Sequence, residues 1–305
     1  MFRLKTKHFL TGEELSIDEL NNLIDLAIVL KSEKRNEALK DKTVGLLFEK
    51  PSLRTRVSFT VGIQELSGNL IEMNSSLRKK ETPEHTIKVL QGYINALMIR
   101  TFEHNILEDM AKFSKIPIIN GLSDLHHPCQ VLADIMTLKE NFTTLKGLKV
   151  CYVGDGNNML HSLMLLMPFL GIDLHYSCPK DFQPFPGILK RAETRAEDSG
   201  ALIMNFKNPQ DAVKEVHAIY TDVWSSMGFE KTDDDEKQHL KKFEGFQLNS
   251  NLFLLANPNA VIMHCMPVNI DQEITSEMIN HPQAVLFQQS ENRLHAQKAL
   301  MMGLI

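Results

Sequence analysis

The chain has 305 residues, of which 33 are Lys or Arg and 38 are Asp or Glu, so its formal net charge is −5. At roughly 150 residues per domain the length favours two domains, and 43% hydrophobic with 23% charged residues is typical of a globular protein with a sizeable core. The acidic balance argues against nucleic acid as a partner, since such binding depends on surplus cationic charge.

The sequence also disfavours several environments. Its longest apolar stretch, 163–170, is broken by Pro168 and is far shorter than the ~20 residues of a membrane span. The N-terminus lacks the apolar core of a secretory signal. The cysteines form no CxxC pair that would suggest a disulfide framework or a zinc ribbon; they are Cys129, Cys151, Cys178 and Cys265. We therefore expect a cytoplasmic protein with no membrane partner.

Strands and helices are expected to alternate in the first half of the chain. Ser16 and Glu19 form a capping box, and apolar residues follow at helical spacing as far as Leu30. Further helices are predicted at 55–66, 106–113 and 131–138. The predicted strands are short and apolar, at 44–48, 70–73, 96–99 and 116–119.

A second alternating series follows the polar segment 139–147. Its predicted strands are 148–153, 172–176, 217–220, 261–264 and 284–287, and its predicted helices are 159–170 and 291–300. The acidic run 233–236 is expected to be a solvated, mobile loop rather than a metal site. The alternation predicts the α/β class, with two domains that are each a parallel sheet with helices on both faces.

The first candidate site follows the first predicted strand. Ligands of open parallel sheets bind beyond the carboxyl ends of the strands, where loops lead into helices. The segment 50–56 (KPSLRTR) places two hydroxyls, backbone N–H groups and the guanidinium of Arg54 at a helix start, which suits an anion such as phosphate. The Gly-rich pattern of a nucleotide P-loop is missing. The alternative is a capped helix with two solvated arginines.

Two later strand ends add groups that suit the same ligand. Arg100 follows the strand at 96–99, and Pro128 suits the first turn of a helix, which places His127 at its start and Gln130 one turn on. A histidine beside a helix N-terminus tends to stay neutral, so it can donate a hydrogen bond to a carbonyl; a capping role without a ligand is the alternative. His126 and Cys129 lie nearby, but no further ligand follows at metal spacing, so we predict no metal there.

The second half carries amide, acidic and thiol groups at its strand ends. The segment 154–159 (GDGNNM) fits the dinucleotide pattern GxGxxG poorly, because Met159 stands at the third glycine; a nicotinamide-dependent dehydrogenase of the Rossmann type is therefore a distant alternative. Asn157 and Asn158 instead direct amides at the sheet edge. Asp222 with the following serines, and Cys265, each stand just past a strand and suit a zwitterionic amine.

Taken together, these segments resemble the aspartate/ornithine carbamoyltransferase family. Six motifs occur in the order of the family and span nearly the whole chain. They are 48–59 (FEKPSLRTRVSF), 127–134 (HPCQVLAD), 154–158 (GDGNN), 222–228 (DVWSSMG), 264–267 (HCMP) and 291–295 (ENRLH).

The resemblance implies a role for each matched position. The phosphate of carbamoyl phosphate would be bound by Ser52, Leu53, Arg54 and Thr55, with Arg100 bridging to the carbonyl. His127 and Gln130 would hold the carbamoyl group, Arg293 would reach it from the C-terminal helix, and Cys265 with Met266 would line the point where the substrates meet. The residues that would bind ornithine are Asn158, Asp222, Ser226 and Met227.

The implied activity is transfer of the carbamoyl group from carbamoyl phosphate to the δ-amine of L-ornithine, giving L-citrulline and phosphate, as part of arginine metabolism. Residues 1–138 with the C-terminal helix at 290–305, which returns to the first domain, would bind carbamoyl phosphate, and 139–289 would bind ornithine. Thr55, Arg100 and His127 would stabilise the oxyanion, and Asp222 and Cys265 would orient the amine. The resemblance implies a homotrimer or a multiple of trimers, and neither a metal nor an organic cofactor.

The chain departs from the family pattern at three places. Leu53 replaces a hydroxyl residue, and we expect it to contribute its backbone N–H; Met266 replaces a leucine, and 85–88 (HTIK) differs from the usual loop near the subunit boundary. A carbamoyltransferase with another amine acceptor, such as putrescine or an N-acylornithine, is the nearest alternative, which the Ser226–Met227 segment disfavours. A further alternative is a non-catalytic member of the family. The complete set of matched polar residues argues against it.

Overall fold

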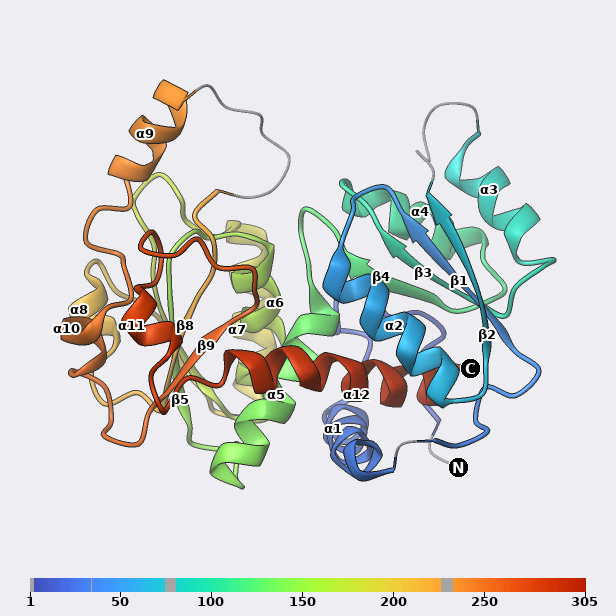
Figure 1. Cartoon of the computed structure of the whole chain (residues 1–305), viewed down its shortest axis with the longest axis horizontal. Helices are drawn as coiled ribbons and strands as arrows, with labels where there is room; N and C mark the ends of the chain where they lie inside the picture. Colours follow the sequence, from blue (N-terminus) through green and yellow to red (C-terminus); the bar gives the residue numbers. More distant parts are fainter. Residues whose placement is uncertain (1–2, 34, 75–80, 226–232) are drawn as a thin grey trace. The chain divides into compact units, whose positions relative to one another are not determined.

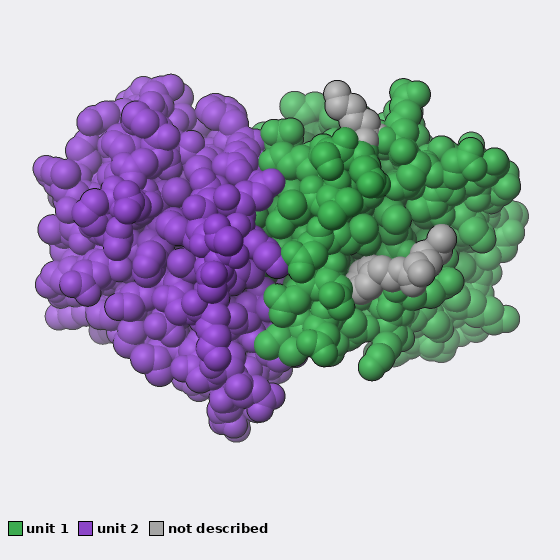
Figure 2. Space-filling model, turned by 90° about the horizontal axis from the view of Figure 1, so that it is seen from below, with its two compact units in different colours: residues 1–136, 291–305 green, residues 137–290 purple. Residues whose placement is uncertain are grey.

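The computed structural model describes residues 3–33, 35–74, 81–225 and 233–305 (Figure 1). The chain divides into two compact units, which Figure 2 colours separately: unit 1 contains Met1–Met136 and Glu291–Ile305, and unit 2 contains Thr137–Ser290. The sequence predicts the boundaries between the two domains at 138/139 and 289/290. In the structure, the boundaries between the units lie at 136/137 and 290/291. Two helices, α5 and α12, contain these changes within their length.

Unit 1 is built on a parallel sheet with the strand order β2-β1-β3-β4. The inner strands are almost entirely buried, as expected where helices cover both faces of a parallel sheet. The strands are β1 (Thr43–Phe48), β2 (Asn69–Asn74), β3 (Ala96–Arg100) and β4 (Ile118–Leu122). The helices are α1 (Ile17–Ser32), α2 (Leu53–Glu65), α3 (Pro83–Leu90), α4 (His104–Phe113), α5 (Pro128–Phe142) and α12 (Leu286–Leu304).

The N-terminal segment extends this sheet beyond β4. Phe9 forms a parallel bridge with Ile119 and is fully buried. Beside it, the Nδ1 atom of His8 accepts a hydrogen bond from the backbone N–H of Ile118 at 3.1 Å. Burial, with a smaller contribution from the charge of Lys7, lowers the pKa of His8 to about 4. The neutral imidazole is therefore part of the folded structure, because a protonated Nδ1 cannot accept this bond.

We expect the protein to lose stability as pH falls from 6.5 to 4, in part through His8. In this window the unfolded chain binds a proton at His8 that the folded chain does not, so the free energy of unfolding decreases with decreasing pH. The variant His8→Gln offers an uncharged acceptor and should lose stability less steeply over the same range. Thermal unfolding midpoints of both proteins between pH 7.5 and 4 measure this, and parallel curves would contradict it.

Unit 2 is built on a second parallel sheet, with the order β7-β6-β5-β8-β9. Its strands are β5 (Lys149–Val153), β6 (Asp173–Ser177), β7 (Ile203–Asn205), β8 (Ala218–Thr221) and β9 (Val261–His264). Its helices are α6 (Asn158–Leu166), the 3-10 helix η1 (Pro168–Leu170), α7 (Pro186–Glu197), α8 (Pro209–Ala212), α9 (Asp233–Lys241), α10 (Ser250–Phe253) and α11 (Ser276–Ile279). Among the described residues, no helix is both long and apolar enough to cross a membrane.

The predicted fold class is confirmed: both units are parallel sheets flanked by helices (Figure 1). The return of the C-terminal helix is confirmed too. Lys298 of α12 is 1% exposed and donates to the carbonyl oxygen of Leu30 in α1 at 3.0 Å and to Oε2 of Glu65 in α2 at 2.6 Å. The last helix is therefore fixed against two helices of unit 1.

Two local predictions were wrong. The acidic run 233–236, expected as a loop, begins helix α9 (Asp233–Lys241), whose last turn carries the basic residue Lys241 at the end that the helix dipole favours for positive charge. The apolar segment 284–287, expected as a strand, contributes one bridge from Ala284 to Ile262, and α12 already starts at Leu286. A short apolar run has no periodicity that separates a buried strand from a buried helix start.

Candidate active site

The strand orders place two groups of polar residues at the carboxyl ends of the sheets. In unit 1 the order reverses between β1 and β3, and in unit 2 it reverses between β5 and β8. Loops leaving neighbouring strands at such a point turn to opposite faces of the sheet and leave room for a ligand. In unit 1, residues 52–55 follow β1 at the start of α2, and Arg100 is the last residue of β3. In unit 2, residues 157–158 follow β5 at the start of α6, and Asp222 directly follows β8.

In unit 1, the start of α2 presents an anion-binding arrangement. Ser52 is the N-cap, and its Oγ accepts the N–H of Thr55 at 3.3 Å. Leu53 is 72% exposed, so its side chain is not part of the core. Arg54 is half-buried in the same first turn. The helix dipole and the unbonded N–H groups of this turn favour negative charge here.

Two arginines from distant parts of the chain reach the same hydroxyl in this turn. Arg100 Nη1, at the end of β3, lies 3.3 Å from Thr55 Oγ1, and Arg293 Nη2, on α12, lies 2.7 Å from it. All three side chains are buried, at 0% exposure for Thr55, 4% for Arg100 and 3% for Arg293. Two guanidinium groups this close in a region of low dielectric create a strong local positive potential, which a phosphate group would neutralise.

His127 lies in the same positive region and is held neutral. It is 5% exposed, and burial, followed by the charges of Arg293 and Arg100, lowers its pKa well below the usual value. The sequence predicted a neutral His127 because a helix begins at Pro128. The structure shows two further causes of the lowered pKa, which are burial and the charges of two arginines. A neutral imidazole has one N–H to donate, which suits a carbonyl oxygen.

Gln130 follows one turn later on α5 and is fully buried. Its Nε2 donates to Oδ1 of Asp134 at 2.8 Å. Its Oε1 is buried and accepts no hydrogen bond from the described residues. Cys129, between these residues, donates its thiol to the carbonyl oxygen of Asn120, and burial raises its pKa to about 12.

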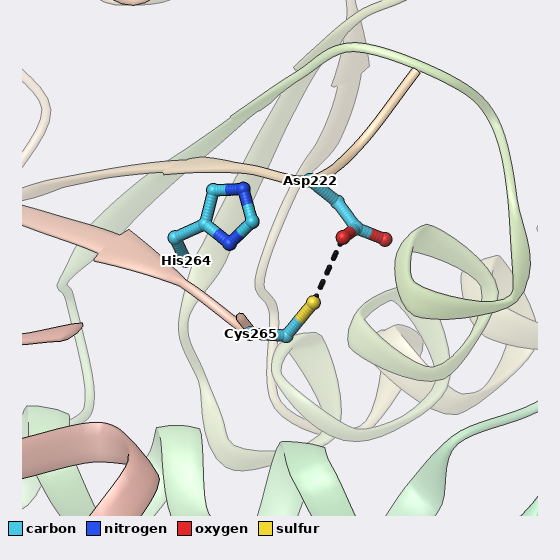
Figure 3. A group of neighbouring side chains, drawn as sticks. All are labelled: Asp222, His264 and Cys265. Carbon is cyan, nitrogen blue, oxygen red and sulfur yellow. Dashed lines mark hydrogen bonds between the residues drawn. The ribbon is translucent and has the colours of Figure 1, made fainter. Parts of the chain in front are cut away.

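In unit 2, the carboxylate of Asp222 organises the loops after three strands. Its Oδ1 accepts the thiol of Cys265 at 2.9 Å and the N–H of Val223 at 2.8 Å, and its Oδ2 accepts Nδ2 of Asn157 at 2.9 Å. Figure 3 shows the Asp222–Cys265 bond. Asp222 is 6% exposed and Cys265 is half-buried. The carboxylate is thus held in one orientation, with donors on both of its oxygens.

The amide that holds Asp222 belongs to Asn157. Asn157 is the N-cap of α6, and its Oδ1 accepts the N–H groups of Met159 and Leu160. The predicted ligand Asn158 is the first residue of the helix and is half-buried. The backbone at Gly156 packs against the chain at 182–184: a Cβ added there would lie 2.4 Å from the nitrogen of Pro184. The approach that a dinucleotide pyrophosphate needs at this glycine is already filled, which argues against the dehydrogenase alternative.

Asp222, His264 and Cys265 form a triangle whose potential ligand atoms lie within 4.8 Å of one another (Figure 3). The imidazole of His264 is already committed. Its Nδ1 accepts the N–H of Met266 at 2.9 Å, and its Nε2 bonds to Oε1 of Glu273 at 3.1 Å. A cation would have to displace one of these bonds, so His264 serves the conformation of the loop after β9. Met266 has a positive φ of 59°, which this bond helps to maintain.

We expect Glu273→Leu to lower stability by about 2 kcal/mol, because it leaves the buried N–H of His264 without its acceptor. Glu273→Gln keeps an oxygen that can accept from His264 and from the N–H of Asn269, the second donor to Oε1. The thermal unfolding midpoint should therefore fall for the leucine variant and change little for the glutamine variant. Equal midpoints for the two variants would show that the bond to His264 contributes nothing.

Two models of one family match the chain. Residues 7–140 match the carbamoyl-P binding domain of aspartate/ornithine carbamoyltransferase, and residues 146–304 match its Asp/Orn binding domain. The chain belongs to the aspartate/ornithine carbamoyltransferase family. The family resemblance drawn from six sequence motifs is therefore confirmed.

Individual members of the family are similar over their whole length. An ornithine carbamoyltransferase of Bacillus cereus (strain 03BB102) is 45% identical over 305 residues, which cover 99% of this chain and 95% of that protein. A solved ornithine carbamoyltransferase from Pyrococcus furiosus has a TM-score of 0.96 at 40% identity, covering 100% of this chain and 98% of that one. A solved N-acetyl-L-ornithine transcarbamylase has a TM-score of 0.89 at 26% identity, covering 98% and 100%.

The sequence motifs contain Asn157 and Asp134 but did not reveal which side chains these two residues hold. The N-cap role of Asn157 could have been recognised, because asparagine before a helical run is a preferred N-cap. Asp134 stands four residues after Gln130, the spacing at which helical side chains meet. Glu273 gave no local signal, since its partner His264 lies in another element. Of the predicted ligands, Ser226 and Met227 lie outside the described residues; Trp224, just before them, stacks on Phe243 with ring centroids 5.1 Å apart.

Proposed function

We propose that the chain is an ornithine carbamoyltransferase, which transfers the carbamoyl group of carbamoyl phosphate to the δ-amine of L-ornithine and releases L-citrulline and phosphate. The convergence of Arg100 and Arg293 on Thr55 at the start of α2 is the observation that carries this proposal. The full-length similarity to ornithine carbamoyltransferases at 40–45% identity supports the acceptor; the N-acetyl-L-ornithine enzyme is more distant, at 26%.

Unit 1 is proposed to bind carbamoyl phosphate. The backbone N–H groups of 52–55, the hydroxyls of Ser52 and Thr55, and the guanidinium of Arg54 would receive the phosphate oxygens. Arg100 and Arg293, already directed at Thr55, would neutralise its charge. His127, kept neutral, would donate to the carbamoyl oxygen. The unpaired oxygen of Gln130 would accept from the carbamoyl nitrogen.

The chemical step requires stabilisation of charge that develops on the carbamoyl group. The neutral δ-nitrogen attacks the carbamoyl carbon, negative charge grows on the carbonyl oxygen, and the bond from that carbon to the phosphate oxygen then breaks. Thr55, Arg100 and His127 offer donors to this oxyanion from fixed positions, which is commonly the largest single contribution to acyl transfer. The nitrogen loses one proton, and the departing phosphate can accept it. This step needs neither a metal nor an organic cofactor.

Unit 2 is proposed to bind ornithine. The fixed carboxylate of Asp222 provides negative charge for an amino group, and the thiol of Cys265 lies against the same carboxylate. A carboxylate also stabilises the ammonium form, so Asp222 is assigned an orienting role rather than that of the base. Asn158, Ser226 and Met227 are proposed to complete the ornithine site, and Cys265 and Met266 to contact the carbamoyl group.

We further propose, from the family resemblance, a cytoplasmic enzyme of arginine metabolism that assembles as a homotrimer or a multiple of trimers. Residues 1–138 with 290–305 would form the carbamoyl-phosphate domain, and 139–289 the ornithine domain. The family models divide the chain at a similar place, between residues 140 and 146. Sedimentation of the purified protein measures the oligomeric state, and a monomer at micromolar concentration would overturn the trimer.

The function is tested by measuring citrulline and phosphate release with carbamoyl phosphate and a panel of amines: ornithine, putrescine, lysine, N-acetylornithine and N-succinylornithine. We expect a clear preference for ornithine. A preference for another amine would overturn the acceptor assignment but keep the carbamoyl donor. No carbamoylated product from any of these amines would overturn the proposed function.

A further inference from the structure

The side chain of Gln130 is held at one end only. It lies in the first turn of α5, where its backbone N–H donates to the carbonyl oxygen of His127 at 3.1 Å. Its side-chain Nε2 donates to Oδ1 of Asp134 at 2.8 Å, an i,i+4 contact along one face of the helix. Both side chains are fully buried, at 0% exposure.

Asp134 determines which end of the Gln130 amide points away from it. An amide has a donor end and an acceptor end. Because Gln130 donates its Nε2 to Oδ1 of Asp134, the NH₂ group faces Asp134 and Oε1 faces the other way. This oxygen is buried and accepts no hydrogen bond from the described residues. An unpaired buried acceptor costs about 1–3 kcal/mol, so a ligand that brings an N–H to it is favoured.

A carbamoyl group has a polarity that is complementary to that of the side chains of His127 and Gln130. Its carbonyl oxygen accepts hydrogen bonds and its NH₂ donates them. The N-terminal end of α5 offers the matching pair: the neutral imidazole of His127, just before the helix, which can donate, and Oε1 of Gln130 in its first turn, which can accept. A reversed Gln130 amide would instead present NH₂ to the carbamoyl NH₂, and two donors would oppose each other.

We propose that Asp134 is a positioning residue that sets substrate specificity: by fixing the orientation of the Gln130 amide, it makes the site select acyl phosphates that carry an N–H on the acyl group. This inference rests on the proposed function. A site built to bond an N–H discriminates strongly against an analogue that lacks it, because the buried acceptor is then left unpaired. An acetyl group, with a methyl in place of the NH₂, has the same shape and no donor.

The test compares binding of two stable phosphonates by calorimetry. Phosphonoacetamide and acetonylphosphonate both replace the bridging oxygen of the acyl phosphate by CH₂, and they differ only in carrying NH₂ or CH₃. For the wild-type protein we expect phosphonoacetamide to bind at least 20-fold more tightly. In Asp134→Asn, whose amide can either accept or donate, the Gln130 amide is free to reverse, and this preference should fall about 10-fold, chiefly through weaker binding of phosphonoacetamide.

A second variant separates positioning from mere structural support. The exchange Gln130→Glu with Asp134→Asn reverses the donor and the acceptor of the pair, and it still leaves a carboxylate oxygen at position 130 to accept from the ligand. We expect it to restore most of the preference that Asp134→Asn loses. Asp109→Asn, on the exposed face of α4, where Asp109 pairs with Lys112, is the matched control and should match wild type.

The outcomes are distinct. If Asp134→Asn weakens both phosphonates equally, or changes neither, Asp134 does not set the preference and the inference is wrong. An exchange variant that binds both ligands as poorly as Asp134→Asn would also overturn it. Because these measurements need no turnover, a wild-type protein that forms no citrulline would overturn the proposed function while the ratio of the two dissociation constants still decides the role of Asp134.

Discussion

Replacing Arg293 with Gln is expected to lower kcat/KM for carbamoyl phosphate about 1,000-fold. The guanidinium of Arg293 is 3% exposed and donates to Thr55 Oγ1 at 2.7 Å, so it would meet the phosphate and the developing oxyanion where water cannot screen its charge. Loss of one fixed donor to such an oxyanion commonly costs 10²–10³ in rate, and here a positive charge is lost as well. Steady-state citrulline formation at varied carbamoyl phosphate measures the effect.

The variant Arg35→Gln is its control, because Arg35 also belongs to unit 1 and is exposed. It should retain wild-type kinetics and show that the loss is not a general consequence of removing a positive charge. The fold of Arg293→Gln should be checked by thermal unfolding, since α12 remains held to α1 and α2 by Lys298. A loss of less than ten-fold in kcat/KM would contradict the place of Arg293 in the phosphate site.

Replacing Asp222 with Asn is expected to lower kcat/KM for ornithine about 300-fold. The substitution removes the negative charge that would orient the amino group, and it replaces one of the two oxygens that accept from the Cys265 thiol and the Asn157 amide by an NH₂ group. Hydrogen bonds to a charged acceptor that is largely desolvated are about twice as strong as neutral ones. Initial rates at varied ornithine, with carbamoyl phosphate saturating, measure the effect.

The affinity of the Asp222→Asn variant for inorganic phosphate serves as an internal control for its loss of activity with ornithine. Asp222 belongs to unit 2, and the proposed phosphate site is built from unit 1, so the dissociation constant of inorganic phosphate should stay within two-fold of wild type. Arg293→Gln should show the reverse pattern and weaken phosphate binding strongly. An Asp222→Asn enzyme with an unchanged kcat/KM for ornithine would remove this residue from the ornithine site.

Much of the fold could be predicted because the pattern is local. The capping box of Ser16 and Glu19 forms as expected, with the carboxylate of Glu19 receiving the N–H of Ser16 at 2.9 Å. Short apolar strands that alternate along the chain with amphipathic helices identify the α/β class and the parallel pairing. The order of the strands, and hence the point where ligands bind, depends on pairings between distant segments and carries no local signature.

The residues of the candidate site could be predicted only where they, too, carry a local signal in the sequence. Arg100, His127 and Asp222 follow strands and could be found by searching strand ends. Arg293 could not be found this way, because it lies inside the last helix, and only the family resemblance pointed to it. That it reaches Thr55, 238 positions earlier, depends on how α12 packs against unit 1. Residues that hold other residues, such as Glu273, are recognised only when their partners are known in three dimensions.

The discontinuity of unit 1 has a consequence for synthesis of the protein. Its sheet is encoded in the first 136 residues, but Arg293 belongs to a second segment of unit 1 that follows all 154 residues of unit 2, Thr137–Ser290. Domains generally begin to fold in the order in which the ribosome releases them. Here the first sheet can form early, whereas the proposed phosphate site stays incomplete until the ribosome has released α12. A nascent chain stalled before α12 is therefore expected to be folded in part yet to lack the guanidinium of Arg293 at Thr55.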